Sequence, residues 1–366
     1  MVKKTLKEIE KVMLKEQEID VTDISSLSIE LEHLSPQYRI EPPEPFTLDQ
    51  MIKKLEEKKL YFPENNSKKK CIDLLNTLGY YNLKHFINNE FEKDEEKNFD
   101  SIYSLYEFDR YLSKQLYSLL NTLEVHIRNL ILEVYMLEIE ERELPPSLFY
   151  LDKSIYFEKV EDEYKINNKK RYNFNKLQSK FANAIDQKSN NENIKHNLRK
   201  YEIIPAWVLF QSISFGELSM FYTYTLSKNK KIVCKKIEDL INENLSKKIK
   251  IPYKLFGGWC NNIRYLRNKI AHTDIIYGVN LIQTCAEHRE DAEYFNRLNE
   301  YNYQQRLITY LLAMQKIFMS MPKYCIDLWN HTLDDIQLKA DSDNNIKLSR
   351  IGILDNNVNY LKIDTF

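Results

Sequence analysis

The sequence predicts an all-α protein, a helical bundle with an N-terminal helical extension. Glycine and proline are scarce, at 6 and 10 of 366 residues, whereas sheet-rich folds need frequent turn residues. Hydrophobic residues make up 43% of the chain, enough for a sizeable core, and they recur at helical spacing over long stretches. Lys, Glu, Leu, Ile, Asn and Tyr dominate the composition, which suits helices with charged outer faces.

Residues 1–45 are predicted to be a helical and extended N-terminal extension that ends in a linker. Apolar residues between Leu6 and Met13 fall at helical spacing. The segment SPQYRIEPPEP at 35–45 holds three closely spaced prolines, which forbid helix there. Residues 46–100 follow as a small helical unit, in which Thr47 caps one helix and Gly79 ends another.

Residues 101–330 are predicted to form the main helical domain, with a tail at 331–366. Its first helix continues from Ser101 for about forty residues without glycine or proline, a rod of roughly 60 Å. A last long helix is expected at about 301–322, and IKLSRIGIL in the tail is expected to form a short strand. Four aromatic residues are expected in the core: Trp207, Phe210, Phe215 and Trp259.

Charge and cysteine content narrow the possible functions. The net charge is −1, so affinity for nucleic acid must come from local patches. The five cysteines are odd in number, widely spaced and without a CxxC pair, so we expect buried thiols rather than disulfides or a zinc site. No run of 18 uncharged apolar residues occurs, and no apolar segment follows the basic first residues. We therefore expect a cytoplasmic protein that is neither exported nor bound to a membrane.

One short motif points to chemistry. Arg267, Asn268 and His272 form the pattern R-N-x-x-x-H, and on a helix Asn268 and His272 share a face. Arg267 lies on the adjoining edge, and its guanidinium is long enough to reach the same spot. Histidine suits proton transfer near neutral pH, and arginine suits the charge on a phosphorane-like transition state. Such a site matches the needs of RNA cleavage without metal or cofactor. On spacing alone, however, a C-terminal histidine favoured by the helix dipole is the better explanation of the motif.

Four segments of the chain resemble, in order, those of a known family. They are LNTLGYYNLKHFINNEF, SIYSLYEFDRYLSKQLYSLLNTLEVHIRNLILEVY, PAWVLFQSISFGELSMFYTYTL and NNIRYLRNKIAH. Together they resemble the Abi-like (AbiD and AbiF type) abortive-infection family of bacterial phage-defence proteins, part of the HEPN superfamily, over about 46–330. The resemblance implies a HEPN-like helical bundle with metal-independent RNase activity, at a composite site built from two R-x4-H motifs.

By this resemblance, Arg267 and His272 match the catalytic pair and Asn268 matches the polar residue between them. The chain has one complete motif, because the similar Arg128 is followed by Glu133 where a histidine would stand. One chain then supplies half of the composite site, and a homodimer is implied. After the histidine the sequence reads TDIIYG instead of an Asn-Arg-like continuation, so local substrate contacts are expected to differ from the family's pattern.

Further candidates lie outside the motif. Under the resemblance, Glu124 and Arg128 line the site, although their i, i+4 spacing equally fits a surface ion pair. Arg264 either binds phosphate or only solvates its helix. His126 falls on another face of the helix.

A basic insertion at about 165–200 is the best candidate for RNA contact. It holds ten bases and two acids, a net charge of +8, with Tyr and Phe residues among them. RNA binding combines backbone neutralisation with stacking, and Lys169, Lys170 and Arg171 are the residues expected to provide it. The alternative is that these basic residues only form a solvent-exposed helix surface and bind no RNA.

The expected function is that of a HEPN endoribonuclease in abortive infection, whose toxicity is controlled by a bound non-coding RNA or an antitoxin. The alternative is an RNA-binding HEPN module, or regulatory scaffold, that does not cleave. The expected partners are RNA and a second copy of the chain, with no membrane or DNA partner.

Overall fold

The computed structural model describes residues 44–90, 96–298 and 303–364. The chain divides into two compact units, residues 1–51 and 52–366, which are described separately. In the first, Thr47 and Gln50 cap the start of α3 (Leu48–Glu56) through reciprocal hydrogen bonds of 2.8 and 3.3 Å, as the sequence predicts. The remainder of the predicted extension, residues 1–43, lies outside the described residues.

The second unit is helical almost throughout its described residues. Strands occur there as two pairs of two residues each: β1 (Leu60–Tyr61) with β2 (Lys97–Asn98), parallel, and β3 (Lys159–Val160) with β4 (Glu163–Tyr164), antiparallel. The longer regular elements described are helices. The predicted all-α class is therefore confirmed.

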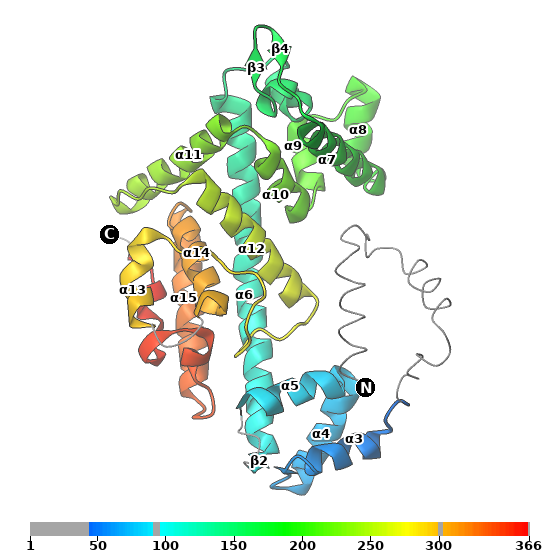
Figure 1. Cartoon of the computed structure of the whole chain (residues 1–366), viewed down its shortest axis with the longest axis vertical. Coiled ribbons are helices and arrows are strands. Elements are labelled where there is room, and N and C mark those ends of the chain that lie inside the picture. Colours follow the sequence, from blue (N-terminus) through cyan, green and yellow to red (C-terminus); the bar gives the residue numbers. More distant parts are fainter. Residues whose placement is uncertain (1–43, 91–95, 299–302, 365–366) are drawn as a thin grey trace, which may run out of the picture. The chain divides into compact units, whose positions relative to one another are not determined.

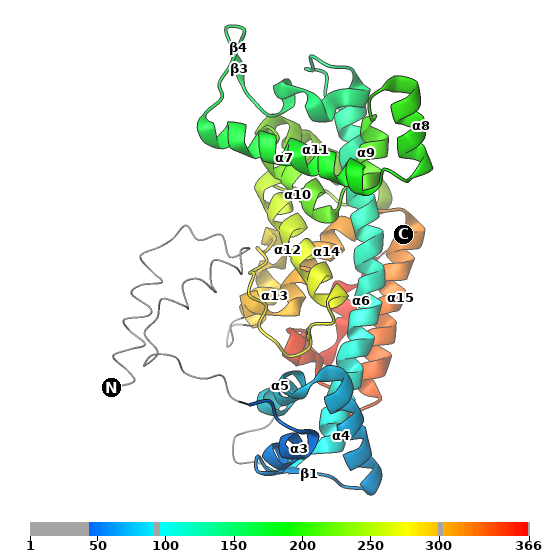
Figure 2. The same ribbon diagram turned by 90° about the vertical axis from the view of Figure 1, so that its right-hand side faces the viewer.

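The long helix predicted from residue 101 is α6 (Phe99–Glu133). Asn98 caps its start by accepting a hydrogen bond from the amide of Asp100, and the helix continues as a π-helical turn, η2 (Val134–Glu138). Before it, α4 (Asn65–Leu78) and α5 (Tyr80–Glu90) are separated by Gly79, whose φ of +82° ends α4 as expected. Figures 1 and 2 show α6 with later helices packed along its length.

The segment after α6 builds an aromatic core. Short 3₁₀ turns η3 (Pro146–Leu151) and η4 (Lys153–Ile155) lead to the β3–β4 hairpin. The basic insertion then forms two helices, and two short helices follow: α7 (Asn168–Gln187), α8 (Glu192–Tyr201), α9 (Ala206–Ser212) and α10 (Phe215–Tyr224). Rings from several of these elements contact one another, namely Tyr135, Phe149, Phe181, Phe210 and Phe221.

The C-terminal part of the unit returns along α6. Its long helices are α11 (Ser227–Leu245), α12 (Tyr253–Ala271), α14 (Leu307–Phe318) and α15 (Lys323–Asp341). Its shorter ones are η5 (Arg289–Asp291), α13 (Ala292–Arg297), η6 (Tyr303–Gln305), η7 (Leu348–Ile351), η8 (Leu354–Asn356) and η9 (Val358–Leu361). Both α12 and α15 contact α6.

Two predictions for the C-terminal region are wrong. The predicted last helix at 301–322 is the shorter α14, and it is not the last, because α15 follows Pro322. The segment IKLSRIGIL is no strand, because it forms η7 and then turns at Gly352, where φ is +89°. A Cβ at Gly352 would lie 2.4 Å from Ile308 Cγ2, so only glycine lets the tail approach α14 this closely. The predicted domain limits stay predictions.

The core predictions are confirmed with one exception. Phe210, Phe215 and Trp259 are buried, whereas Trp207 is 42% exposed. Its neighbours on the short helix α9 fill the inward positions, which leaves Trp207 facing out. All five cysteines are free and buried, as expected. Within the described residues, no helix is long and apolar enough to cross a membrane.

Candidate functional site

The motif lies at the end of α12, a helix fixed on several sides. Its buried residues include Phe256, Trp259 and Leu266, and it contacts α6, α10, α11 and α14. The helix begins after Pro252 and includes Gly257 and Gly258. A Cβ at Gly257 would lie 3.2 Å from the Tyr222 ring. The glycine therefore allows α12 to pack closely against α10.

Glu124 on α6 joins two arginines from different helices. Its Oε1 accepts a hydrogen bond of 2.7 Å from Arg128 Nη2, and its Oε2 lies 3.5 Å from Arg267 Nε on α12. The second contact is an ion pair without hydrogen-bond geometry, since Arg267 Nε has no hydrogen-bond partner. The side chains of Glu124, Arg128 and Arg267 are 16%, 15% and 24% exposed. The predicted candidates Glu124, Arg128 and Arg267 thus come together.

Arg264 extends this group toward the start of α10. Arg128 Nη2 also approaches the carbonyl oxygen of Ile213 at 3.4 Å, and a Cβ at Gly216 would lie 3.7 Å from Arg264 Cδ. Ser214 and Glu217 cap α10 there through a capping box. We call Arg128, Arg264 and Arg267 the arginine cluster.

The positive charge of the arginine cluster is only partly balanced by the carboxylate that contacts it. Its three guanidiniums and the one carboxylate of Glu124 carry a formal charge of 3 − 1 = +2. The Nε atom of each arginine is buried and finds no hydrogen-bond partner among the residues that the structure describes. Buried polar groups are almost always hydrogen-bonded, and planar guanidinium donors suit phosphate oxygens. The arrangement is therefore chemically suited to an anion such as an RNA phosphate.

Among the described residues, no side-chain hydrogen bond or ion pair joins His272 or Asn268 to the arginine cluster. His272 is the exposed C-cap of α12, where its amide donates to the carbonyl oxygen of Asn268 at 2.9 Å. The next residue, Thr273, takes a left-handed φ of +62° and leads the chain away from the helix. The structure thus groups Arg267 with α6, while the imidazole of His272 faces outward from the last turn.

A buried pair on α6 that the sequence analysis missed holds the segment after His272. Asp109 is fully buried, and its Oδ1 accepts hydrogen bonds of 2.8 Å from the amides of Ile276 and Tyr277. Arg110 pairs with Asp109 and donates to the carbonyl oxygens of Thr273 and Asp274 at 2.8 and 3.0 Å. These bonds tie residues 273–277 to α6 and so position the end of α12.

The sequence did hold a signal for Asp109. It falls on the apolar stripe of α6 that includes Leu105, Phe108 and Leu112, where an acid must be paired to be tolerated. Nothing in the sequence says what it pairs with, because its partners are backbone amides 167 and 168 residues further along the chain.

Two other residues play structural parts. His126 Nε2 lies 3.1 Å from Ser320 Oγ, away from the arginine cluster, and burial lowers the pKa of the imidazole to about 4. Glu133, which stands where a second motif would need histidine, forms an ion pair with Lys236 at 3.0 Å.

Lys169, Lys170 and Arg171 lie in the first turn of α7, capped by Asn167. Within the described residues none of them forms an ion pair, and Lys169 and Arg171 are exposed. Three positive side chains at a helix N-terminus are electrostatically unfavourable, because the helix dipole already makes that end positive. Since α7 packs on α10, whose start adjoins the arginine cluster, the basic helix and the cluster share a neighbour (Figure 2).

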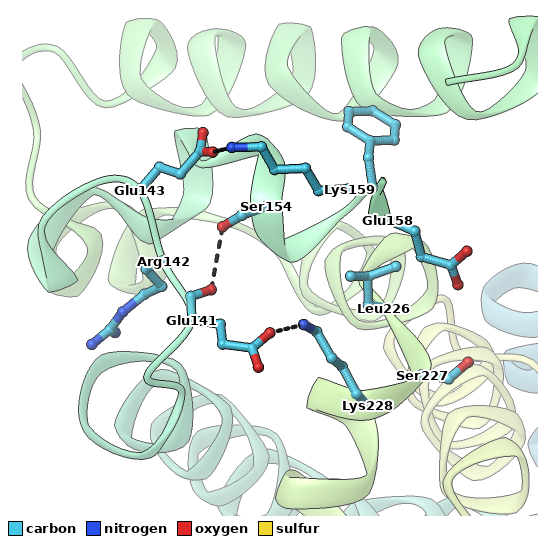
Figure 3. Close-up of a pocket in the computed structure, with 10 residues that line it drawn as sticks. Glu141, Arg142, Glu143, Ser154, Glu158, Lys159, Leu226, Ser227 and Lys228 are labelled. Atoms are coloured by element: carbon cyan, nitrogen blue, oxygen red, sulfur yellow. Dashed lines mark hydrogen bonds and ion pairs between the residues drawn. The ribbon is translucent and has the colours of Figure 1, made fainter. Parts of the chain in front are cut away.

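The pocket in Figure 3 is not part of this group. It has a volume of about 440 Å³, and its lining includes three acids and three bases. Glu143 pairs with Lys159 at 2.8 Å and Glu141 pairs with Lys228. Its charges are thus balanced internally, and it offers no excess charge to a polyanion. Across the described part of the chain, no group of three or more His, Cys, Asp or Glu is arranged to hold a metal ion.

Comparison with known proteins gives one match. The sequence model of the family described as Abi-like protein matches residues 73–278, or 206 of 366 residues. The matched region contains the arginine cluster, Glu124, Asp109 and His272. No curated protein and no solved structure matches the chain.

We predict that Asp109→Ala frees the segment after His272. Losing the carboxylate leaves two buried amides without an acceptor, at a cost of about 1–3 kcal/mol each. Hydrogen exchange at the amides of Ile276 and Tyr277 should become faster. Glu107→Ala, an exposed acid on the same helix, should leave both amides protected; equal protection in Asp109→Ala would contradict the role given to Asp109.

Proposed function

The chain belongs to the family of Abi-like proteins, and we propose that it is a metal-independent endoribonuclease of the HEPN type. We propose that it acts in abortive infection, as a defence against phage. The arginine cluster carries this proposal, because three partly buried guanidiniums with unpaired N–H groups beside the R-x4-H motif suit an RNA phosphate. Its toxicity would then need control by a bound RNA or an antitoxin.

The proposed reaction is transfer of the RNA phosphate to its own 2′-oxygen. The 2′-hydroxyl loses its proton and attacks phosphorus, and the 5′-oxygen leaves and gains a proton. The products are a 2′,3′-cyclic phosphate and a 5′-hydroxyl. His272 would transfer one of these protons, the role that imidazole takes in general acid–base catalysis. Arg267 would stabilise the charge on the phosphoryl oxygens, where bidentate donors are most effective.

Glu124 and Arg128 support Arg267 in this proposal. Glu124 contacts both guanidiniums, so it orients Arg267 from α6 while leaving the cluster a net positive charge. Arg128, and Arg264 beside α10, would bind neighbouring phosphates. Asn268, on the same helix and without a side-chain hydrogen bond in the described residues, would contact the substrate between the catalytic pair.

The exposure of His272 at the end of α12 supports a composite site. Within one chain, no hydrogen bond or ion pair between described residues joins the imidazole to Arg267. We propose that two copies pair through the ends of their α12 helices, so that two R-x4-H motifs form one cleavage site.

The basic insertion would lead RNA to this site. Lys169, Lys170 and Arg171 offer charge at the start of α7. Exposed tyrosines on the same insertion lie under lysines, with Lys176 Nζ 5.7 Å from the Tyr172 ring and Lys200 Nζ 4.9 Å from the Tyr201 ring. Backbone neutralisation together with base stacking is how single-stranded nucleic acid is held.

A second candidate is an RNA-binding protein that does not cleave. The outward placement of His272 favours it, since the arginine cluster would bind phosphate without the imidazole. The cleavage experiment that follows separates the two.

We predict that His272→Ala and Arg267→Ala each abolish cleavage and toxicity. Loss of proton transfer should lower the rate by roughly 10²–10⁴, and loss of the guanidinium by a comparable factor. The double variant should be little slower than either single one, since the two act together. Cleavage should persist in EDTA and leave cyclic-phosphate ends, measured on purified protein with a labelled RNA.

The control is His331→Ala, an exposed histidine on α15, which should keep full activity. Circular dichroism should be unchanged in all three single variants, and RNA affinity should be unchanged in His272→Ala and His331→Ala. A dependence on added divalent metal, or full activity of His272→Ala, would exclude the HEPN mechanism. Tight RNA binding with no cleavage under any condition would favour the second candidate.

We predict a homodimer, because each chain supplies one R-x4-H motif. Light scattering should give twice the chain mass of 44.0 kDa. Mixing inactive His272→Ala with inactive Arg267→Ala should restore part of the activity if each copy lends the missing group. A stable monomer, both free and with RNA, rules out the composite site.

We predict that replacing Lys169, Lys170 and Arg171 with Ala weakens RNA binding and its salt dependence. Three lost phosphate contacts should reduce the slope of log affinity against log salt by about 2. The matched control replaces Lys68, Lys69 and Lys70, three consecutive bases in the first half of α4. If both triple variants bind alike, the start of α7 is only a solvated face.

A further inference from the structure

One tryptophan faces solvent on α9, the helix whose end adjoins the arginine cluster. Trp259 and Trp329 are buried, and the indole N–H of each donates to a backbone carbonyl oxygen at 2.8 Å. Trp207, by contrast, is 42% exposed, and its indole has no hydrogen bond or ring contact with the described residues. We propose that Trp207 stacks on a base of single-stranded RNA. This inference rests on the proposed function, to which it adds a binding site for a nucleobase.

The exposed side of α9 leads from Trp207 to the arginine cluster. Trp207 and Gln211 are exposed and lie one turn apart on the same face of the helix. The next exposed residue is Ser214, at the turn into α10. Beside it, the carbonyl oxygen of Ile213 lies 3.4 Å from Arg128 Nη2. At the helical rise of about 1.5 Å per residue, Ile213 lies roughly 9 Å along the axis from Trp207, so neighbouring nucleotides of one strand can reach both.

The ring of Trp207 stands on a rigid base. The helix α9 contacts α6, α7 and η3 (Figure 1). Its other residues apart from Gln211 are buried, namely Ala206, Val208, Leu209, Phe210 and Ser212. A tryptophan side chain has few rotatable bonds, so holding it against a ligand costs little conformational entropy. The structure therefore presents the ring in advance of binding.

The charges around Trp207 favour nucleic acid over an apolar protein surface. The arginine cluster adjoins one end of α9, and Arg199 and Lys200 are exposed in the last turn of α8 before its other end. The link at 202–205 holds one acid, Glu202. A nucleotide brings both a flat base for the ring and a phosphate for the cations. In a duplex the bases already stack on one another, so the ring suits a single strand.

Stacking on Trp207 would make the site tolerant of sequence. The flat face of every base can stack on an aromatic ring, and this contact does not read the base edge. We therefore expect RNA of any sequence to bind here, provided that its bases are unpaired.

Tryptophan fluorescence of the full-length chain tests the inference. An exposed indole that stacks on a base is quenched, whereas the buried rings of Trp259 and Trp329 are shielded from the ligand. The probes are a single-stranded 2′-O-methyl RNA, which cannot be cleaved through its 2′-oxygen, and an abasic oligomer of the same length and charge. The RNA should quench the fluorescence to saturation and bind more tightly than the abasic oligomer, which should leave the fluorescence unchanged.

Two variants and one control locate the contact. Trp207→Ala should weaken RNA binding by roughly 5- to 100-fold, the usual effect of losing one stacked base, and should leave affinity for the abasic oligomer unchanged. Trp207→Phe keeps a ring, so it should bind RNA more tightly than Trp207→Ala while losing the quenching. Tyr324→Ala removes a ring that is 74% exposed on α15, and it should bind as the wild type does.

Several outcomes overturn the stacking site. It fails if the RNA does not bind or does not quench, if Trp207→Ala binds RNA as tightly as Tyr324→Ala, or if Trp207→Phe binds no more tightly than Trp207→Ala. It also fails if Trp207→Ala weakens binding of the abasic oligomer equally. Cleavage of unmodified RNA is measured separately. Quenching without cleavage leaves the stacking site standing and contradicts the proposed endoribonuclease, whereas cleavage without quenching contradicts the stacking site alone.

Discussion

A single 35-residue helix, α6, constrains almost every part of the second unit. Its buried side chains form a continuous stripe from Phe99 to Ile131, and α5, α9, α10, α12, α14 and α15 all contact it. Burial of one large apolar side chain contributes about 1.5–3 kcal/mol, so a stripe of this length fixes the helices that cover it. The candidate site depends on this packing, because Glu124 and Asp109 both project from α6 toward α12 and the segment that follows it.

Two acids on α6, Asp109 and Glu124, differ in how fully the charges around them are balanced. The carboxylate of Asp109 is fully buried and is bonded to two backbone amides and to Arg110. Its role is to hold the segment after His272 against α6. Glu124 compensates only part of the charge of three arginines, whose Nε atoms remain without partners. Leaving buried donors unpaired costs stability, and such a cost is reasonable where a ligand supplies the missing acceptors.

Errors in the sequence-based predictions have physical causes. Trp207 was expected inside because large aromatics are usually buried, but a seven-residue helix has too few positions to bury every apolar residue. IKLSRIGIL was expected to be a strand because it is rich in β-branched residues, and Gly352 turns it back onto α14 instead. The helix α15 was missed because its second half is rich in Asp; its stripe of Trp329, Leu333 and Ile336 packs inward.

The sequence by itself determined the helical class, the span of α6 and the residues of the motif, because these follow from local spacing and composition. Hydrophobic periodicity and scarce turn residues act within a few residues of each other and need no tertiary contact. Only the tertiary structure decided that Glu124, paired with Arg128 one turn along α6, also contacts Arg267, and that Asp109 holds the amides of Ile276 and Tyr277. The contacts of Glu124 with Arg267 and of Asp109 with the two amides join residues more than a hundred positions apart. They depend on how helices rotate when their apolar faces pack, which local spacing does not encode.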